Sequence, residues 1–128
     1  MTRGLEPGYE PPTKAVVEWV LLEAERHAEI TGWKIVPLRV SEISPRENIH
    51  WISQKEFREW KAGLIEQYRS DPAAVNPIVV VKRKGEYLIL DGHHRWRSAK
   101  LSGRKAIWVV QVSGRLKEPG YREKQEQW

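Results

Sequence analysis

Residues 78–103 read IVVVKRKGEYLILDGHHRWRSAKLSG and contain three structural elements in a row. The β-branched run 78–81 predicts a strand, and 86–90 predicts its return partner after a short turn. Gly92 then opens a short helix that Gly103 ends. A strand that passes through a glycine into a helix is therefore the unit around which we expect the rest of the fold to assemble.

Two further helices are predicted outside this unit. Apolar residues at spacings of three and four predict a helix that Thr13 caps and Gly32 ends. A second helix is expected to start at Ser53 and to close at Asp71. Both carry one apolar face, so we expect each of them to cover a sheet.

The remaining strands are predicted over 33–40 and 106–112, where apolar residues dominate. Pro37 favours a place at the edge of the sheet for the first of them, because proline has no N–H to donate to a neighbouring strand. The hairpin 78–90 is then expected at the centre. Together these elements predict an α+β fold, a small mixed sheet with flanking helices.

Length and composition indicate one domain. The 128 residues are 40% hydrophobic and 30% charged, and we expect an extended N-terminal arm over 1–12, a single domain over 13–112 and a polar tail over 113–128. No apolar run approaches the roughly 18 residues that cross a bilayer, so we expect a cytoplasmic protein without membrane contact. The absence of cysteine excludes disulfides and thiolate chemistry.

The seven tryptophans divide into two groups. Four lie within apolar segments and are expected in the core: Trp19, Trp60, Trp96 and Trp108. The other three are candidates for an exposed surface, on which a homodimer could form: Trp33, Trp51 and Trp128.

The segment from Asp91 to Arg95 carries the chemistry. The first N–H groups of a helix have no partner within it, the helix dipole adds positive charge there, and Gly92 lets an oxygen approach the backbone. Arg95 can donate two parallel hydrogen bonds to a phosphate, and His93 and His94 can exchange protons near neutral pH. These residues predict a phosphate site in which Asp91 could hold Mg²⁺.

Two plainer interpretations stay open. Asp91 could merely cap the helix while the histidines cover a surface turn. The cluster could also bind zinc, but adjacent helical residues point about 100° apart, whereas zinc ligands favour spacings of three or four.

Two segments, 76–81 and 87–96, resemble the core signature of the ParB/sulfiredoxin superfamily, and the resemblance covers about residues 34–112. The motif Asp-Gly-His-His-Arg at residues 91–95 is similar to the corresponding motif of the archaeal free-serine kinases in this superfamily. Sulfiredoxin activity is excluded, because His93 occupies the place of its nucleophilic cysteine. The resemblance implies a ParB/sulfiredoxin-like fold.

The resemblance further implies in-line transfer of a phosphoryl group from ADP or ATP to a small hydroxyl compound such as free serine. Glu47 would be the catalytic base, and Asp91 and His93 would act beside it, with Asp91 on Mg²⁺. The nucleotide would be held by the set Asn76, Ile78, Gly92, His93, His94 and Arg95. The nucleobase stays open, and CTP is not excluded.

Two other function classes stay open. Residues 71–128 carry twelve Lys or Arg against six Asp or Glu, so this basic half could contact nucleic acid, as a ParB-like DNA-binding domain or a nuclease, through Arg95, Arg97, Lys100, Arg104 and Lys105. We expect no helix-turn-helix reader, since too few residues follow the last strand. A non-catalytic nucleotide sensor is the third class.

Overall fold

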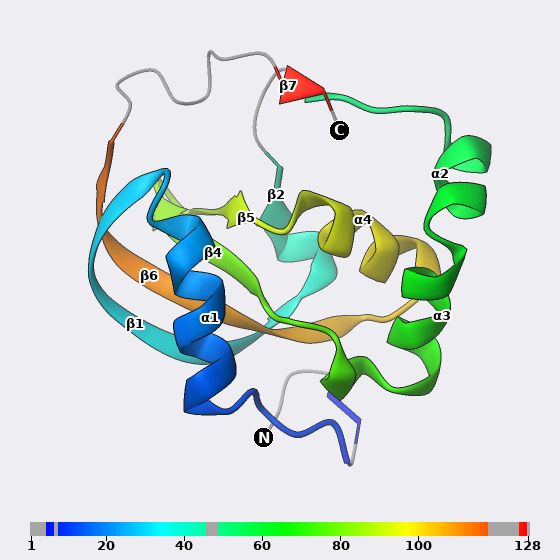
Figure 1. Cartoon of the computed structure of the whole chain (residues 1–128), viewed down its shortest axis with the longest axis horizontal. Coiled ribbons are helices and arrows are strands. Elements are labelled where there is room, and N and C mark those ends of the chain that lie inside the picture. Colours follow the sequence, from blue (N-terminus) through cyan, green and yellow to red (C-terminus); the bar gives the residue numbers. More distant parts are fainter. Residues whose placement is uncertain (1–4, 7, 46–48, 118–125, 128) are drawn as a thin grey trace.

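The computed structural model describes residues 5–6, 8–45, 49–117 and 126–127. It has the expected α+β architecture (Figure 1). The helices are α1 (Lys14–Ala24), α2 (Gln54–Trp60), α3 (Ala62–Ser70) and α4 (His93–Ser102), with short 3₁₀ helices η1 (Val40–Glu42) and η2 (Pro72–Ala74). The strands are β1 (Ala28–Arg39), β2 (Ile43–Ser44), β3 (Ile49–His50), β4 (Ile78–Arg83), β5 (Glu86–Asp91), β6 (Ala106–Leu116) and β7 (Glu126–Gln127).

Five strands form the main sheet in the order β1-β6-β4-β5-β2, while β3 and β7 pair separately. The sheet is mixed: β4 runs antiparallel to β5 and parallel to β6. The edge position predicted for the strand with Pro37 is confirmed, and β4 lies in the middle. The hairpin turn has positive φ at Lys84 and Gly85, which matches the right-handed twist of the two strands.

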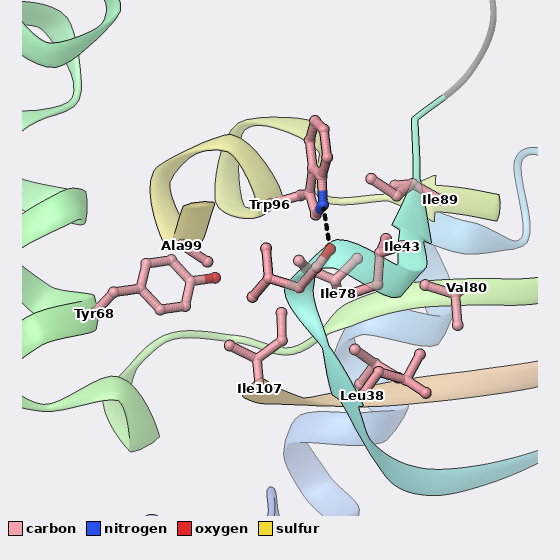
Figure 2. Close-up of a cluster of buried hydrophobic side chains, with 11 residues drawn as sticks. Leu38, Ile43, Tyr68, Ile78, Val80, Ile89, Trp96, Ala99 and Ile107 are labelled. Atoms are coloured by element: carbon pink, nitrogen blue, oxygen red, sulfur yellow. Dashed lines mark hydrogen bonds between the residues drawn. The ribbon is translucent and has the colours of Figure 1, made fainter. Parts of the chain in front are cut away.

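Each face of the sheet carries its own apolar core. Alternate residues of β4 divide between them, because successive side chains of a strand point to opposite faces. Val79 and Val81 pack with α1, whereas Ile78 and Val80 pack with α3 and α4. Figure 2 shows the second core, in which Trp96 of α4 stands over η1. The sheet is thus covered by helices on both faces.

The first helix is shorter than predicted. Thr13 caps it as expected, through its Oγ1 and the N–H of Val16 at 3.4 Å, but the helix ends at Ala24 instead of Gly32. From Ala28 the chain belongs to β1, which pairs with β6 over eleven positions. This pairing with a strand 67 to 88 positions away overrides the local helical pattern.

The second predicted helix is divided into α2 and α3 at Lys61, whose φ of −108° and ψ of 24° are not helical. Ser53 caps its start as expected, with Ser53 Oγ 3.1 Å from the N–H of Glu56. Because of this break, α3 packs along α4, while Phe57 of α2 contacts His94 in the first turn of α4.

Two of the four tryptophans expected in the core are exposed, Trp19 by 63% and Trp60 by 54%. Trp96 is buried, Trp108 and Trp51 are partly buried, and Trp33 is exposed. Trp128 lies outside the described residues. In α1 the buried positions are Val17, Val20 and Ala24, so Trp19 falls on the outer face of the helix.

Candidate functional site

The predicted phosphate site lies where β5 passes into α4. Asp91 is the last residue of β5, Gly92 is the N-cap, and His93 is the first helical residue. The first hydrogen bond of the helix joins the Trp96 N–H to the Gly92 carbonyl oxygen at 2.8 Å. The N–H groups before Trp96 therefore belong to the part of the helix where the dipole favours an anion.

Gly92 is required at this junction for two reasons. Its φ of 107° is a left-handed conformation that other residues rarely adopt. A Cβ at this position would also lie 2.9 Å from Nη2 of Arg95 and 3.2 Å from Cγ1 of Ile78. The Arg95 guanidinium is therefore packed directly against the glycine backbone.

Arg95 is held in place by two acceptors. Its Nη2 lies 3.0 Å from Oδ2 of Asp91 and 3.3 Å from the carbonyl oxygen of Pro77, and both charged side chains are about three-quarters buried. The Arg95 Nε is buried and has no acceptor among the described residues. The ion pair thus fixes the guanidinium, while its buried Nε has no partner within the described part of the chain.

The two histidines lie in different surroundings. His93 is fully buried, with its ring 6.5 Å from that of Trp51. His94 is partly buried, with its ring 4.9 Å from that of Trp60. Burial lowers the pKa of His94, and the positive charges of Lys61 and Arg95 lower it further. These surroundings therefore favour the neutral form of the His94 imidazole.

An aromatic cluster that the sequence did not predict lies over the start of α4. Trp51 and Phe57 pack edge to face at 6.4 Å, and the Arg97 guanidinium lies 4.9 Å and 4.6 Å from their ring centres. Arg97 also donates to the Ile52 carbonyl oxygen at 2.9 Å. The only sequence signal for this contact is aromatic residues in a loop and at the start of a helix, which many packing arrangements share.

Of the other predicted site residues, Ile78 is fully buried and supports Gly92 from inside the protein. Asn76 is exposed, next to the Pro77 carbonyl that holds Arg95. Glu47, the predicted base, lies outside the described residues; the chain is described up to Pro45 and again from Ile49.

The resemblance implies a Mg²⁺ ion, for which the junction offers the carboxylate of Asp91. The described residues contain no group of three or more His, Cys, Asp or Glu that could hold a metal ion. Mg²⁺ is commonly held by one or two carboxylates together with substrate phosphates. Asp91 fits that pattern as the one carboxylate ligand of the junction. Its Oδ2 is already engaged by Arg95.

The five basic residues predicted to face nucleic acid do not form one free surface. Arg95 is paired with Asp91, Arg97 donates to the Ile52 carbonyl oxygen, and Arg104 donates to the Tyr68 carbonyl oxygen at 2.6 Å. Lys100 and Lys105 are exposed. Three of the five guanidinium or ammonium groups thus hold the protein's own backbone or side chains.

The N-terminal arm docks on β6. The indole Nε1 of Trp108 donates to the Tyr9 carbonyl oxygen at 2.8 Å, and the Trp108 N–H donates to the Tyr9 hydroxyl at 3.3 Å. Burial raises the pKa of Tyr9.

No described helix has both the length and the apolar character needed to cross a membrane.

The chain is thus an α+β domain with a mixed sheet, in which Gly92 joins a strand to a helix and the Arg95 guanidinium is fixed beside that link. The chain belongs to the ParB N-terminal domain family, whose model matches residues 23–118. The family resemblance predicted from residues 76–81 and 87–96 is therefore confirmed.

An ATP-dependent L-serine kinase from Desulfurococcus mucosus is 46% identical over 77 residues, which are 59% of this chain and 29% of that protein. The chain thus spans less than a third of this curated relative. The predicted similarity to serine kinases is therefore confirmed over these 77 residues.

Two solved structures are similar to the chain. The C-terminally truncated chromosome-partitioning protein ParB from Caulobacter crescentus, complexed with CTP-gamma-S, has a TM-score of 0.48 and 20% identity, and the match covers 73% of this chain and 49% of that one. A conserved hypothetical protein from Pyrococcus furiosus has a TM-score of 0.44 and 24% identity, over 67% of this chain and 34% of that one.

Proposed function

We propose that the chain is a nucleotide-binding phosphotransferase that moves a phosphoryl group from ATP or ADP to a small hydroxyl compound such as free serine. The observation that carries the proposal is the β5–α4 junction, where Gly92 brings the helix N-terminus and Arg95 together. The similarity to an ATP-dependent L-serine kinase supports the choice of reaction.

In this proposal the phosphates lie against the first turn of α4. The backbone N–H groups from Gly92 to His94 bind phosphoryl oxygens, and Arg95 stabilises the charge that develops on them. Asp91 positions Arg95 through their 3.0 Å contact, so the guanidinium needs no reorganisation when the nucleotide binds. Most of the rate enhancement in phosphoryl transfer comes from such positioning and charge stabilisation.

Glu47 is proposed as the base that accepts the hydroxyl proton of the acceptor. It follows Pro45 by two residues, and Pro45 directly follows β2, the neighbour of β5 in the sheet. Because the His93 ring is fully buried, we assign proton transfer to Glu47. His93 then binds phosphoryl oxygens through its backbone N–H. His94, whose surroundings favour the neutral form, contributes a hydrogen bond rather than charge.

A Mg²⁺ ion bound with the nucleotide would neutralise charge on the phosphate oxygens. Asp91 is the residue proposed to contact it. Asp91 would then contact the ion as well as Arg95, which it already binds through Oδ2.

The test is incubation with labelled ATP or ADP, Mg²⁺ and a panel of hydroxyl compounds that includes L-serine. Wild type is compared with Arg95→Ala and with Arg83→Ala, a control at the exposed hairpin end of β4. We expect phosphorylated product from wild type and Arg83→Ala, and a loss of about 10²- to 10³-fold in Arg95→Ala.

Failure of wild type to form product with any acceptor would contradict the transfer reaction. Binding of nucleotide without any product would make the chain a nucleotide sensor. Equal turnover in Arg95→Ala and Arg83→Ala would contradict the role of the junction.

A further inference from the structure

A cavity of about 850 Å³ lies between η1 and the C-terminal half of α4. Its apolar wall is formed mainly by Val40, Ile43, Pro45 and Trp96. Small-molecule sites typically have volumes of about 300–1,000 Å³, with mostly apolar walls and a few convergent polar groups. The size and the wall of this cavity both match that description.

The rim of the cavity is positively charged. It carries Arg39, Lys100, Arg104 and Lys105, and among the described residues that line it none is acidic. Arg104 is already engaged, by the Tyr68 carbonyl and by an ion pair with Glu6 at 3.6 Å. The other three side chains are exposed, and no ion pair joins them within the described part of the chain.

Lys100 is directed toward the apolar wall. Its Nζ lies 5.2 Å from the centre of the Trp96 ring, within the range of a cation–π contact. A flat apolar group that lies against the wall would therefore place an attached anion beside this ammonium group. Lys105 is tied to the same wall, because its carbonyl oxygen accepts from the Val40 N–H at 2.9 Å.

The cavity lies beside the C-terminal half of α4, whereas the β5–α4 junction lies at the start of that helix. The Trp96 indole Nε1 donates to the Val40 carbonyl oxygen at 3.3 Å, which joins α4 to η1 at this point (Figure 2). Trp51 packs 6.2 Å from Trp96 on the side of His93. Lys100 lies eight residues beyond Gly92, which is about 12 Å along a helix that rises 1.5 Å per residue.

We propose that this cavity is a second ligand site, for a phosphorylated small molecule with a flat apolar body. The apolar wall takes the body, and Arg39, Lys100 and Lys105 take the phosphate. Three cations exceed what a single carboxylate needs, while a phosphate monoester carries nearly two charges at pH 7. The site does not depend on the proposed phosphotransferase reaction.

The experiment uses 1-naphthyl phosphate as probe, with inorganic phosphate and 1-naphthol as the two half-probes, on the whole chain by calorimetry and by amide and indole NMR shifts. We expect 1-naphthyl phosphate to bind about tenfold more tightly than either half-probe, with shifts at Val40, Trp96 and Lys100.

The double variant Lys100→Gln/Lys105→Gln is expected to lose about tenfold in affinity for the probe and to retain nucleotide binding at Gly92. The control Lys82→Gln/Lys84→Gln removes the same charge from the exposed hairpin and should bind the probe as wild type does. An NMR spectrum of each variant confirms that it folds.

Equal probe affinity in both double variants, or probe shifts at Gly92 and His94 instead of Trp96, would overturn the proposal. A raised KM for the acceptor in Lys100→Gln/Lys105→Gln would also overturn it, since the cavity would then belong to the phosphotransferase site. Absence of product from wild type contradicts only the proposed function, because probe binding is measured without turnover.

Discussion

Substitution of Gly92 by alanine tests the junction at its most constrained position. At φ 107° an alanine adopts a sparsely populated conformation that costs about 1–3 kcal/mol. The new Cβ would lie 2.9 Å from Nη2 and 3.2 Å from Nε of Arg95. Because these atoms end a flexible side chain, the guanidinium moves away from the Gly92 backbone and loses its place beside the ligand.

The same helix offers a matched control. Gly103, at the other end of α4, also has a left-handed φ of 84°, but a Cβ there meets no atom within 4 Å. Gly103→Ala therefore carries a backbone cost of the same kind without the collision with Arg95. The two variants separate loss of stability from loss of function.

We expect both variants to lower the free energy of unfolding by about 1–3 kcal/mol in urea titrations. In calorimetric titrations with ATP and Mg²⁺, Gly92→Ala should bind at least about tenfold more weakly than wild type, since a charge-assisted contact contributes about 1.5–3 kcal/mol. Gly103→Ala should bind as wild type does. Equal nucleotide affinity in folded Gly92→Ala and Gly103→Ala would refute the reasoning.

Three further predictions concern single side chains. Glu47→Gln should lower turnover about 10²- to 10⁴-fold while nucleotide affinity is unchanged; full turnover would reject the base. His94 should titrate below 6.5 by NMR, so that its contribution to stability, complete above pH 6.5, falls as the pH drops through its lowered pKa; Lys61→Met should raise that pKa, and a value above 6.5 in wild type would contradict the surroundings described. Arg97→Met should lower the free energy of unfolding by about 1–2 kcal/mol, through loss of the bond to Ile52, without changing oligonucleotide retention in gel shifts; weaker retention would favour the DNA-binding class.

Short-range signals predicted the parts of the fold that depend on neighbouring residues. The caps at Thr13 and Ser53 and the tight turn at Gly85 each involve contacts within a few positions. The strand, glycine and helix around Gly92 also depend on residues that are close together in the sequence. These features follow from the conformational preferences of individual residues, which a sequence displays directly.

Long-range pairing decided the parts that were predicted wrongly. The pattern of residues 25–31 continues a helix, but residues 25–27 form a turn and the chain pairs with β6 from Ala28 onward. The last strand also continues past Val112 to Leu116. Gly114, with φ 146°, allows this, because a Cβ there would overlap the Glu29 carbonyl oxygen. Nothing near Gly114 in the sequence indicates which strand approaches it.

The motif predicted where the candidate site lies, and the structure added how its members are held. The sequence could not show that Asp91 pairs with Arg95, that the His93 ring is buried, or that Trp60 contacts His94. The contact of Trp60 with His94 and the burial of the His93 ring depend on the break at Lys61 and on the packing of α4 against its neighbours. Residue types therefore define the chemistry available, while tertiary packing decides which groups reach a ligand.

The most direct measurement is a titration of the isotope-labelled chain with ATP and Mg²⁺, followed by amide NMR. If the start of α4 binds the phosphates, the largest shifts will fall on the backbone N–H groups of Gly92, His93 and His94 and on the Arg95 Nε–H. Shifts confined to residues distant from this turn, with those four signals unchanged at saturating nucleotide, would contradict the account.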